Sequence, residues 1–82
     1  MEELLIQDKT FDKKDFTQKP LAKGEYENCS FTGCDFSNAE LTDIRFLECT
    51  FKNCNLSMAH LAGTAFMVIQ FTGCKMLGLH FE

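Results

Sequence analysis

The fold is decided by residues 24–82, which read in groups of five as GEYEN, CSFTG, CDFSN, AELTD, IRFLE, CTFKN, CNLSM, AHLAG, TAFMV, IQFTG, CKMLG and LHFE. The third position of each group is large and apolar: Tyr26, Phe31, Phe36, Leu41, Phe46, Phe51, Leu56, Leu61, Phe66, Phe71, Met76 and Phe81. A helix would spread a five-residue repeat around its whole circumference, and a strand alternates with a period of two. The period therefore predicts neither a regular helix nor an ordinary strand.

The first and fifth positions of each group complete the pattern. First positions are small or apolar, with cysteine at Cys29, Cys34, Cys49, Cys54 and Cys74. Fifth positions are mostly Gly, Asn or Asp, which tolerate a positive φ or hydrogen-bond their own turn. Each pentapeptide is therefore expected to form one side of a coil, with its first and third residues buried inside. Val68 is a β-branched exception at a fifth position, so we expect its corner to differ in turn type from the corner at Gly73.

This pattern resembles the pentapeptide-repeat family, whose central residue is Leu or Phe and whose preceding inward residue is usually Ala or Cys. The resemblance implies an all-β fold, a right-handed quadrilateral β-helix with twenty residues per coil and about three full coils. A twenty-residue period stacks equivalent residues at the spacing of neighbouring strands, about 4.8 Å. The expected core ladders are Phe31, Phe51 and Phe71, and Cys34, Cys54 and Cys74.

Upstream of these repeats, the five-residue register continues while the interior chemistry changes. Large apolar residues recur at Ile6, Phe11, Phe16 and Leu21, but lysines fill the inward first positions at Lys9, Lys14 and Lys19. A solenoid requires a polar unit at its end to shield strand edges from other chains. We therefore divide the chain into residues 1–22, an amino-terminal cap or degenerate first coil, and residues 23–82, the repeat β-helix.

Length and charge narrow the possible functions. The chain has 82 residues, and 12 acidic residues against 8 basic ones give it a net charge of −4. This size indicates one small domain, and the acidic surplus argues against direct binding of nucleic acid. The sequence contains no apolar run of membrane-spanning length, and Met1-Glu2-Glu3 is not typical of a signal peptide. We expect a cytoplasmic protein without membrane contact.

The cysteines and histidines raise the question of a metal. Cys29 with Cys34, and Cys49 with Cys54, resemble two halves of a zinc site, yet each occupies the inward position that Ala fills elsewhere. Their register favours packing as free thiols, with zinc as the alternative. His60 and His80 are expected outside in one column above Glu40, where a solvated surface is favoured over a transition-metal site. We expect no metal, no cofactor and no catalytic residues, and hence no enzyme.

Within the family, the segment Cys54-Asn55-Leu56-Ser57-Met58-Ala59 is similar to the fluoroquinolone-resistance branch called Qnr, as are Phe16-Thr17 and Cys34-Asp35-Phe36-Ser37. This resemblance implies a non-catalytic interaction module that imitates DNA and binds a type II topoisomerase, DNA gyrase or topoisomerase IV, in quinolone resistance. It also implies dimers joined by carboxy-terminal elements. The alternative is a structural or self-assembling repeat scaffold, or a piece of a longer repeat protein, with no topoisomerase partner.

Two features of the predicted surface suggest contacts with a partner. The twenty-residue rule places the apolar side chains of Leu47, Met67 and Val68 on one outer face, which is the candidate interaction surface. The sequence stops at Glu82, in the middle of a pentapeptide, so the rim of the last coil would be apolar and uncovered. We expect either that the chain is a truncated part of a longer protein, or that two copies form a homodimer by stacking their last coils end to end.

Overall fold

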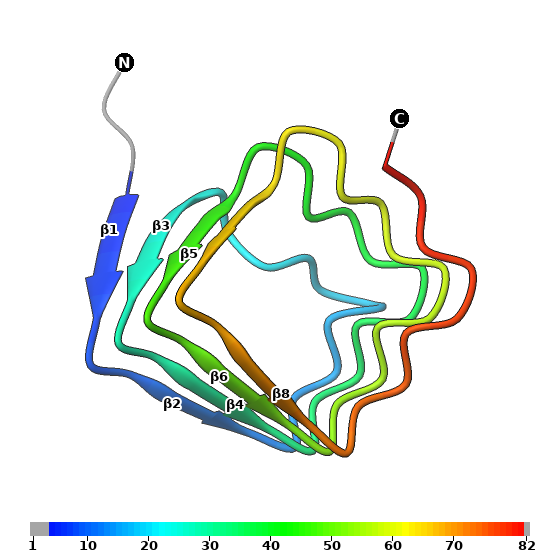
Figure 1. Cartoon of the computed structure of the whole chain (residues 1–82), viewed down its shortest axis with the longest axis horizontal. Helices are drawn as coiled ribbons and strands as arrows, with labels where there is room; N and C mark the ends of the chain where they lie inside the picture. The colour runs from blue at the N-terminus through cyan, green and yellow to red at the C-terminus, as the bar shows by residue number, and fades with distance from the viewer. Residues whose placement is uncertain (1–3, 82) are drawn as a thin grey trace.

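Two parallel sheets form two adjoining sides of a coiled chain in the computed structural model, which describes residues 4–81. One sheet has the order β1 (Leu4–Gln7), β3 (Gly24–Glu27), β5 (Arg45–Leu47) and β7 (Ala65–Met67). The other has the order β2 (Thr10–Asp12), β4 (Ser30–Thr32), β6 (Thr50–Lys52) and β8 (Gln70–Thr72). Figure 1 shows the coils lying over one another as four-sided loops. Among residues 4–81 no helix is long and apolar enough to span a membrane.

The register between coils is twenty residues throughout. Tyr26 pairs with Phe46, and Phe46 with Phe66, along the first sheet. The two sides without continuous strands keep the same register through isolated bridges, which join Asp35 to Asn55 and His60 to His80. Because the chain returns to the same side every four pentapeptides, the predicted all-β, four-sided β-helix is confirmed.

A positive φ at the fifth position turns every described corner except those at Gln18 and Lys23. It is adopted by the glycines Gly33, Gly63, Gly73 and Gly78 and by nine other residues: Asp8, Lys13, Asn28, Asn38, Asp43, Glu48, Asn53, Met58 and Val68. The expectation of a different turn at Val68 is wrong, since its φ of 56° is close to the 63° of Gly73. Backbone hydrogen bonds between coils hold the equivalent corner below, where Glu48 N donates to Met67 O at 2.8 Å. The stacking of coils thus overrides the local preference of a β-branched residue.

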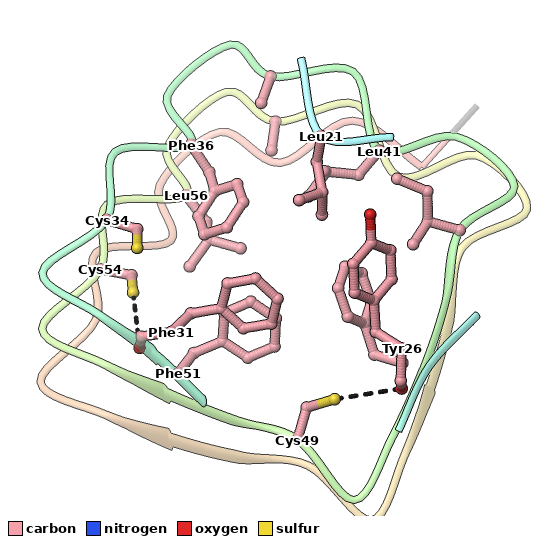
Figure 2. Close-up of a cluster of buried hydrophobic side chains, with 14 of the residues drawn as sticks. Leu21, Tyr26, Phe31, Cys34, Phe36, Leu41, Cys49, Phe51, Cys54 and Leu56 are labelled. Atoms are coloured by element: carbon pink, nitrogen blue, oxygen red, sulfur yellow. Dashed lines mark hydrogen bonds between the residues drawn. The ribbon is translucent and has the colours of Figure 1, made fainter. Parts of the chain in front are cut away.

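Aromatic ladders fill the centre of the coils (Figure 2). The rings of Phe31 and Phe51 stack with centroids 4.8 Å apart and planes 9° apart, and Phe51 and Phe71 follow at 5.2 Å. Across the corner, Phe46 meets Phe51 edge to face at 5.2 Å. Both stacked and edge-to-face pairs suit the charge distribution of aromatic rings. The centre is apolar, because no polar or charged residue in the described part is buried.

Burial decreases toward the last coil. Phe31 and Phe51 are inaccessible, whereas Phe71 is 37% exposed and Cys74 is half-buried. The expectation that every first and third position is inaccessible is therefore wrong for this coil. The cause is geometric, since no described coil lies above it to cover its side chains.

The first coil has three regular sides and an irregular fourth. β1 and β2 pair with β3 and β4, and Asp15 forms a bridge with Asp35. After Phe16 the chain no longer follows the four-sided path of the other coils. In the view of Figure 1 the segment between β2 and β3 crosses the area that the coils enclose, and Leu21 is buried there. The boundary between residues 1–22 and 23–82 stays a prediction; residues 1–3 of the expected cap, and Glu82, lie outside the described residues.

Candidate interaction surface

The proposed apolar contact residues lie together on the outer face of the first sheet. Leu47 and Met67 are register partners on β5 and β7, and Val68 follows Met67 at the corner. Leu47 is half-buried, while Met67 is 51% and Val68 79% exposed. Glu27 pairs with Leu47 from the coil below. We refer to Leu47, Met67 and Val68 as the apolar patch, and an acidic side chain adjoins it.

Acidic side chains cluster on the same side of the molecule and on the side before it. Seven of the 12 acidic residues fall in residues 24–82, against three of the 8 basic ones. One of these bases is already engaged, because Arg45 Nε lies 3.6 Å from Glu25 Oε1. We name this cluster the acidic flank; it consists of Glu25, Glu27, Glu40, Asp43 and Glu48.

Hydrogen bonds hold two carboxylates of this flank in the charged form. Thr42 donates its hydroxyl to Glu40, which lowers the pKa of that carboxyl. The pKa of Glu27 is lowered first by a hydrogen bond with Glu25 and then by one from Gln7, whose Nε2 donates to Glu27 Oε1 at 3.0 Å. Glutamate carboxyls on the surface are already ionised at neutral pH, and the lowered pKa extends the negative charge of both side chains to more acidic solution.

The thiols point into the core and donate to the backbone of the coil below. Cys49 Sγ lies 3.3 Å from Tyr26 O, and Cys54 Sγ lies 3.2 Å from Phe31 O, as Figure 2 shows. Burial raises the pKa of Cys54 to about 11 and also raises that of Cys49. All five cysteines are free. Such thiols are poor nucleophiles, because the reactive species is the thiolate.

The two histidines stack on the outer surface. The rings of His60 and His80 lie 4.8 Å apart with planes 13° apart, in the column that begins at Glu40. Within residues 4–81, no group of three or more His, Cys, Asp or Glu side chains is arranged to hold a metal ion.

The two ends of the β-helix are both hollow and apolar. At the amino-terminal end, a cavity of about 470 Å³ is lined by Ile6, Phe11, Phe16, Leu21 and Tyr26 and by three lysines, Lys9, Lys14 and Lys19. At the carboxy-terminal end, a smaller hollow of about 150 Å³ is lined by Phe66, Phe71, Met76 and Phe81, among others. The sequence analysis did not predict the hollow at the amino-terminal end. The sequence does contain an indication of it, because the lysines at the inward positions cannot fill an apolar interior.

A family model of the pentapeptide repeat region matches residues 25–82, the segment that forms the regular coils. The chain belongs to the pentapeptide-repeat family. We therefore interpret three features of this chain as those of a pentapeptide-repeat β-helix. They are the twenty-residue register, the positive φ at the corners and the inward cysteines. No curated protein sequence matches it significantly.

One of two similar solved structures supports the same fold. A trypsin-treated variant of QnrB1, a plasmid-mediated fluoroquinolone resistance protein, superimposes with a TM-score of 0.53 at 24% identity, over 95% of this chain and 46% of that chain. A second trypsin-treated QnrB1 variant gives a TM-score of 0.38 at 25% identity, over 98% and 46%. This pentapeptide-repeat chain therefore spans less than half the length of the QnrB1 chains. At such identity the likeness establishes the fold alone.

Proposed function

We propose that this pentapeptide-repeat chain is a non-catalytic, cytoplasmic interaction module that binds a type II topoisomerase, DNA gyrase or topoisomerase IV, in place of DNA. The acidic flank is the observation that carries this proposal. Its carboxylates lie on the outside of two adjoining sides of the β-helix, and hydrogen bonds lower the pKa of Glu27 and Glu40 further below neutral pH. A surface that offers several negative charges close together suits a protein groove that binds phosphates. The fold shared with a fluoroquinolone resistance protein supports this choice of partner.

The size of the flank limits the strength of this interaction. The flank lies within residues 25–48, on two adjacent coils about 4.8 Å apart, which corresponds to the rise of about one to two base pairs at 3.4 Å each. We therefore expect weak binding that decreases with salt, because few phosphate-like contacts are available. Leu47, Met67 and Val68, the apolar patch beside the flank, would add a salt-independent contribution.

A supercoiling assay with DNA gyrase, run at increasing protein concentration with and without a fluoroquinolone, tests this function. The test variant Glu27→Gln/Glu48→Gln removes two charges of the acidic flank. The matched control Asp12→Asn/Asp35→Asn removes two charges elsewhere, and Asn at 35 copies Asn55, whose Oδ1 accepts from Ser57 N at 3.0 Å as Asp35 does from Ser37. We expect the first variant to lose any effect on gyrase and the control to retain it. Equal behaviour of the two variants, or no effect of the chain itself, would contradict the proposal.

A scaffold without a topoisomerase partner is the second candidate, favoured by the apolar rim of the last described coil. Phe81 is 68% and Phe71 37% exposed there, and the edges of β7 and β8 face away from the stack. Exposed edges of this kind recruit another chain. In this candidate, two copies stack their last coils into a homodimer. Light scattering over a concentration series would detect the dimer, and Phe81→Asp should abolish it; a monomer at all concentrations contradicts this function.

A further inference from the structure

The hollow at the amino-terminal end combines an apolar floor with a cationic rim. Its floor is made by large side chains from the first coil, including Phe11 and Phe16, whose rings meet edge to face at 6.1 Å. Tyr26 closes the floor from the second coil, and its hydroxyl donates to Ala22 O, which ties the irregular segment to the core. The volume of about 470 Å³ lies within the range of small-molecule sites, about 300–1,000 Å³.

The hollow exists because the first coil keeps the apolar third positions of the core but has lysines at its inward first positions. Lys9 and Lys14 occupy the inward positions that Cys29 and Cys34 fill one coil above. An ammonium group is too costly to bury unpaired, so both side chains are exposed at the opening. Their aliphatic stems line the apolar surface while the charged ends reach water.

The charge around the opening is positive. Among residues 4–81, the three ammonium groups of Lys9, Lys14 and Lys19 line it together with one carboxylate, that of Asp15. That carboxylate is already engaged, because Asp15 Oδ1 accepts from Thr17 N at 2.8 Å and from Thr17 Oγ1 at 2.5 Å. The opening therefore offers an excess of positive charge directly above apolar surface.

We propose that this hollow binds a free fatty acid, an alkyl chain that ends in a carboxylate. The alkyl chain would pack on Phe11, Phe16 and Leu21, and each methylene that leaves water there favours binding. The carboxylate would lie among the lysine ammonium groups, where charge-assisted hydrogen bonds form. This binding is independent of any topoisomerase, since it uses the end of the β-helix and not the acidic flank.

A second copy of the chain fits this end less well. Continuing the β-helix head to tail would place the last coil of one copy on the first coil of the next, with the twenty-residue register maintained. Ile69, Cys74 and Leu79 would then lie against Lys9, Lys14 and Lys19, respectively. Three ammonium groups would lose water without gaining a partner, which is strongly unfavourable. A ligand that carries its own negative charge avoids this cost.

Calorimetric titration with dodecanoate, kept below its micelle concentration, tests the proposal. We expect one saturable site per chain and at least tenfold weaker binding by Lys9→Gln/Lys14→Gln. The matched control Lys52→Gln/Lys75→Gln removes two lysines that do not line the hollow and should bind as the parent protein does. Dodecylammonium has the same alkyl chain with the opposite charge and should bind at least tenfold more weakly.

Nuclear magnetic resonance then locates the ligand. Shifts confined to Phe11, Phe16 and Tyr26 support the proposal, whereas shifts of Phe66 and Phe71 would place the alkyl chain in the carboxy-terminal hollow and overturn it. Equal affinity for the two detergents, or unchanged affinity in the Lys9→Gln/Lys14→Gln variant, would also overturn it. Sedimentation of the free Phe81→Asp variant completes the test, because a dimer that persists without the last-coil contact, and that dodecanoate dissociates, would show that a second copy occupies the hollow and would overturn the proposal.

Discussion

The Sγ atom of Cys54 lies 3.2 Å from the carbonyl oxygen of Phe31 and donates a hydrogen bond to it across the step between two coils. Cys49, Cys34 and Cys74 make the same contact with the residue 23 positions earlier, at 3.1–3.3 Å. Thr64 makes it with a hydroxyl, 2.6 Å from Leu41 O. The inward first position therefore does more than fill space: where the side chain carries a donor, it joins each coil to the backbone of the coil below.

Substitutions at Cys54 should separate this hydrogen bond from packing. Thr and Val have nearly the same shape, but only Thr can donate, as Thr64 does at an equivalent position. We expect Cys54→Thr to be more stable than Cys54→Val by about 1 kcal/mol, the usual net contribution of a hydrogen bond. Urea unfolding measures the difference. Equal stability of the two variants would assign the cysteine to packing alone.

Truncation of Phe51 should be among the most damaging single changes in the core. Its ring is inaccessible and lies between Phe31 at 4.8 Å and Phe71 at 5.2 Å. Phe51→Ala should cost about 3–5 kcal/mol, which is comparable to the whole stability of about 4–12 kcal/mol that is typical for a chain of this length.

Because Phe51→Ala could unfold the protein, Phe51→Leu provides the graded measurement. Leu56 fills the equivalent third position on the next side, so Leu is accepted by this architecture. We expect a loss of about 1–2 kcal/mol for Phe51→Leu and a smaller one for the same change at Phe71, which is 37% exposed. Equal losses at the two positions would indicate that the last coil is covered in solution.

Replacing Val68 should stabilise the protein. Its φ of 56° is unfavourable for a β-branched residue, and strain of this kind costs about 1–3 kcal/mol. Asn and Gly adopt such angles readily and serve at Asn53 and Gly73. We expect Val68→Asn to raise the thermal midpoint and Thr72→Asn, on the neighbouring strand, not to raise it. A lower midpoint for Val68→Asn would show that the exposed valine has contacts that offset its strain.

Stability should fall in alkaline solution for a reason that lies in the core. Burial raises the pKa of Cys54 from 9.0 to about 11 and that of Tyr26 from 10.0 to about 12. The unfolded thiol and phenol lose their protons first, so the unfolded state binds fewer protons and gains relative stability as the pH rises. The contribution is fully present below pH 9 and declines between about pH 9 and 12.

Unfolding by urea at pH 8 and at pH 10.5 measures this loss. In Cys54→Ala the decline between the two values should be smaller than in the parent protein, because one of the titrating groups is absent. An unchanged decline would mean that Cys54 ionises as readily in the folded as in the unfolded state.

The sequence predicts the coils well because a five-residue period has few structural solutions. The columns of Phe31, Phe51 and Phe71 follow from counting by twenty, and the structure places them in that register. Local preference predicts the corner at Val68 wrongly, because hydrogen bonds between coils determine its φ. The lysines at inward positions indicate an unfilled first coil, but the shape of the hollow above Phe11 and Phe16 could not be predicted, since it depends on where the chain leaves this coil after Phe16. The hydrogen bond from Cys54 to Phe31 O could not be predicted either, because it depends on the relative height of neighbouring sides in successive coils.

The stacking of coils at a constant twenty-residue separation also determines how this molecule opens. Each coil contacts only its immediate neighbours, so the chain behaves as a one-dimensional array in which opening starts at the ends. Residues 24–63 have a coil on both faces and should hold the slowest-exchanging amide hydrogens, while residues 4–23 and 64–81 exchange through local fraying. We therefore expect the two hollow ends to be the most dynamic parts of the molecule. A molecule bound at either end would slow amide hydrogen exchange there, because it would cover the exposed face of the terminal coil.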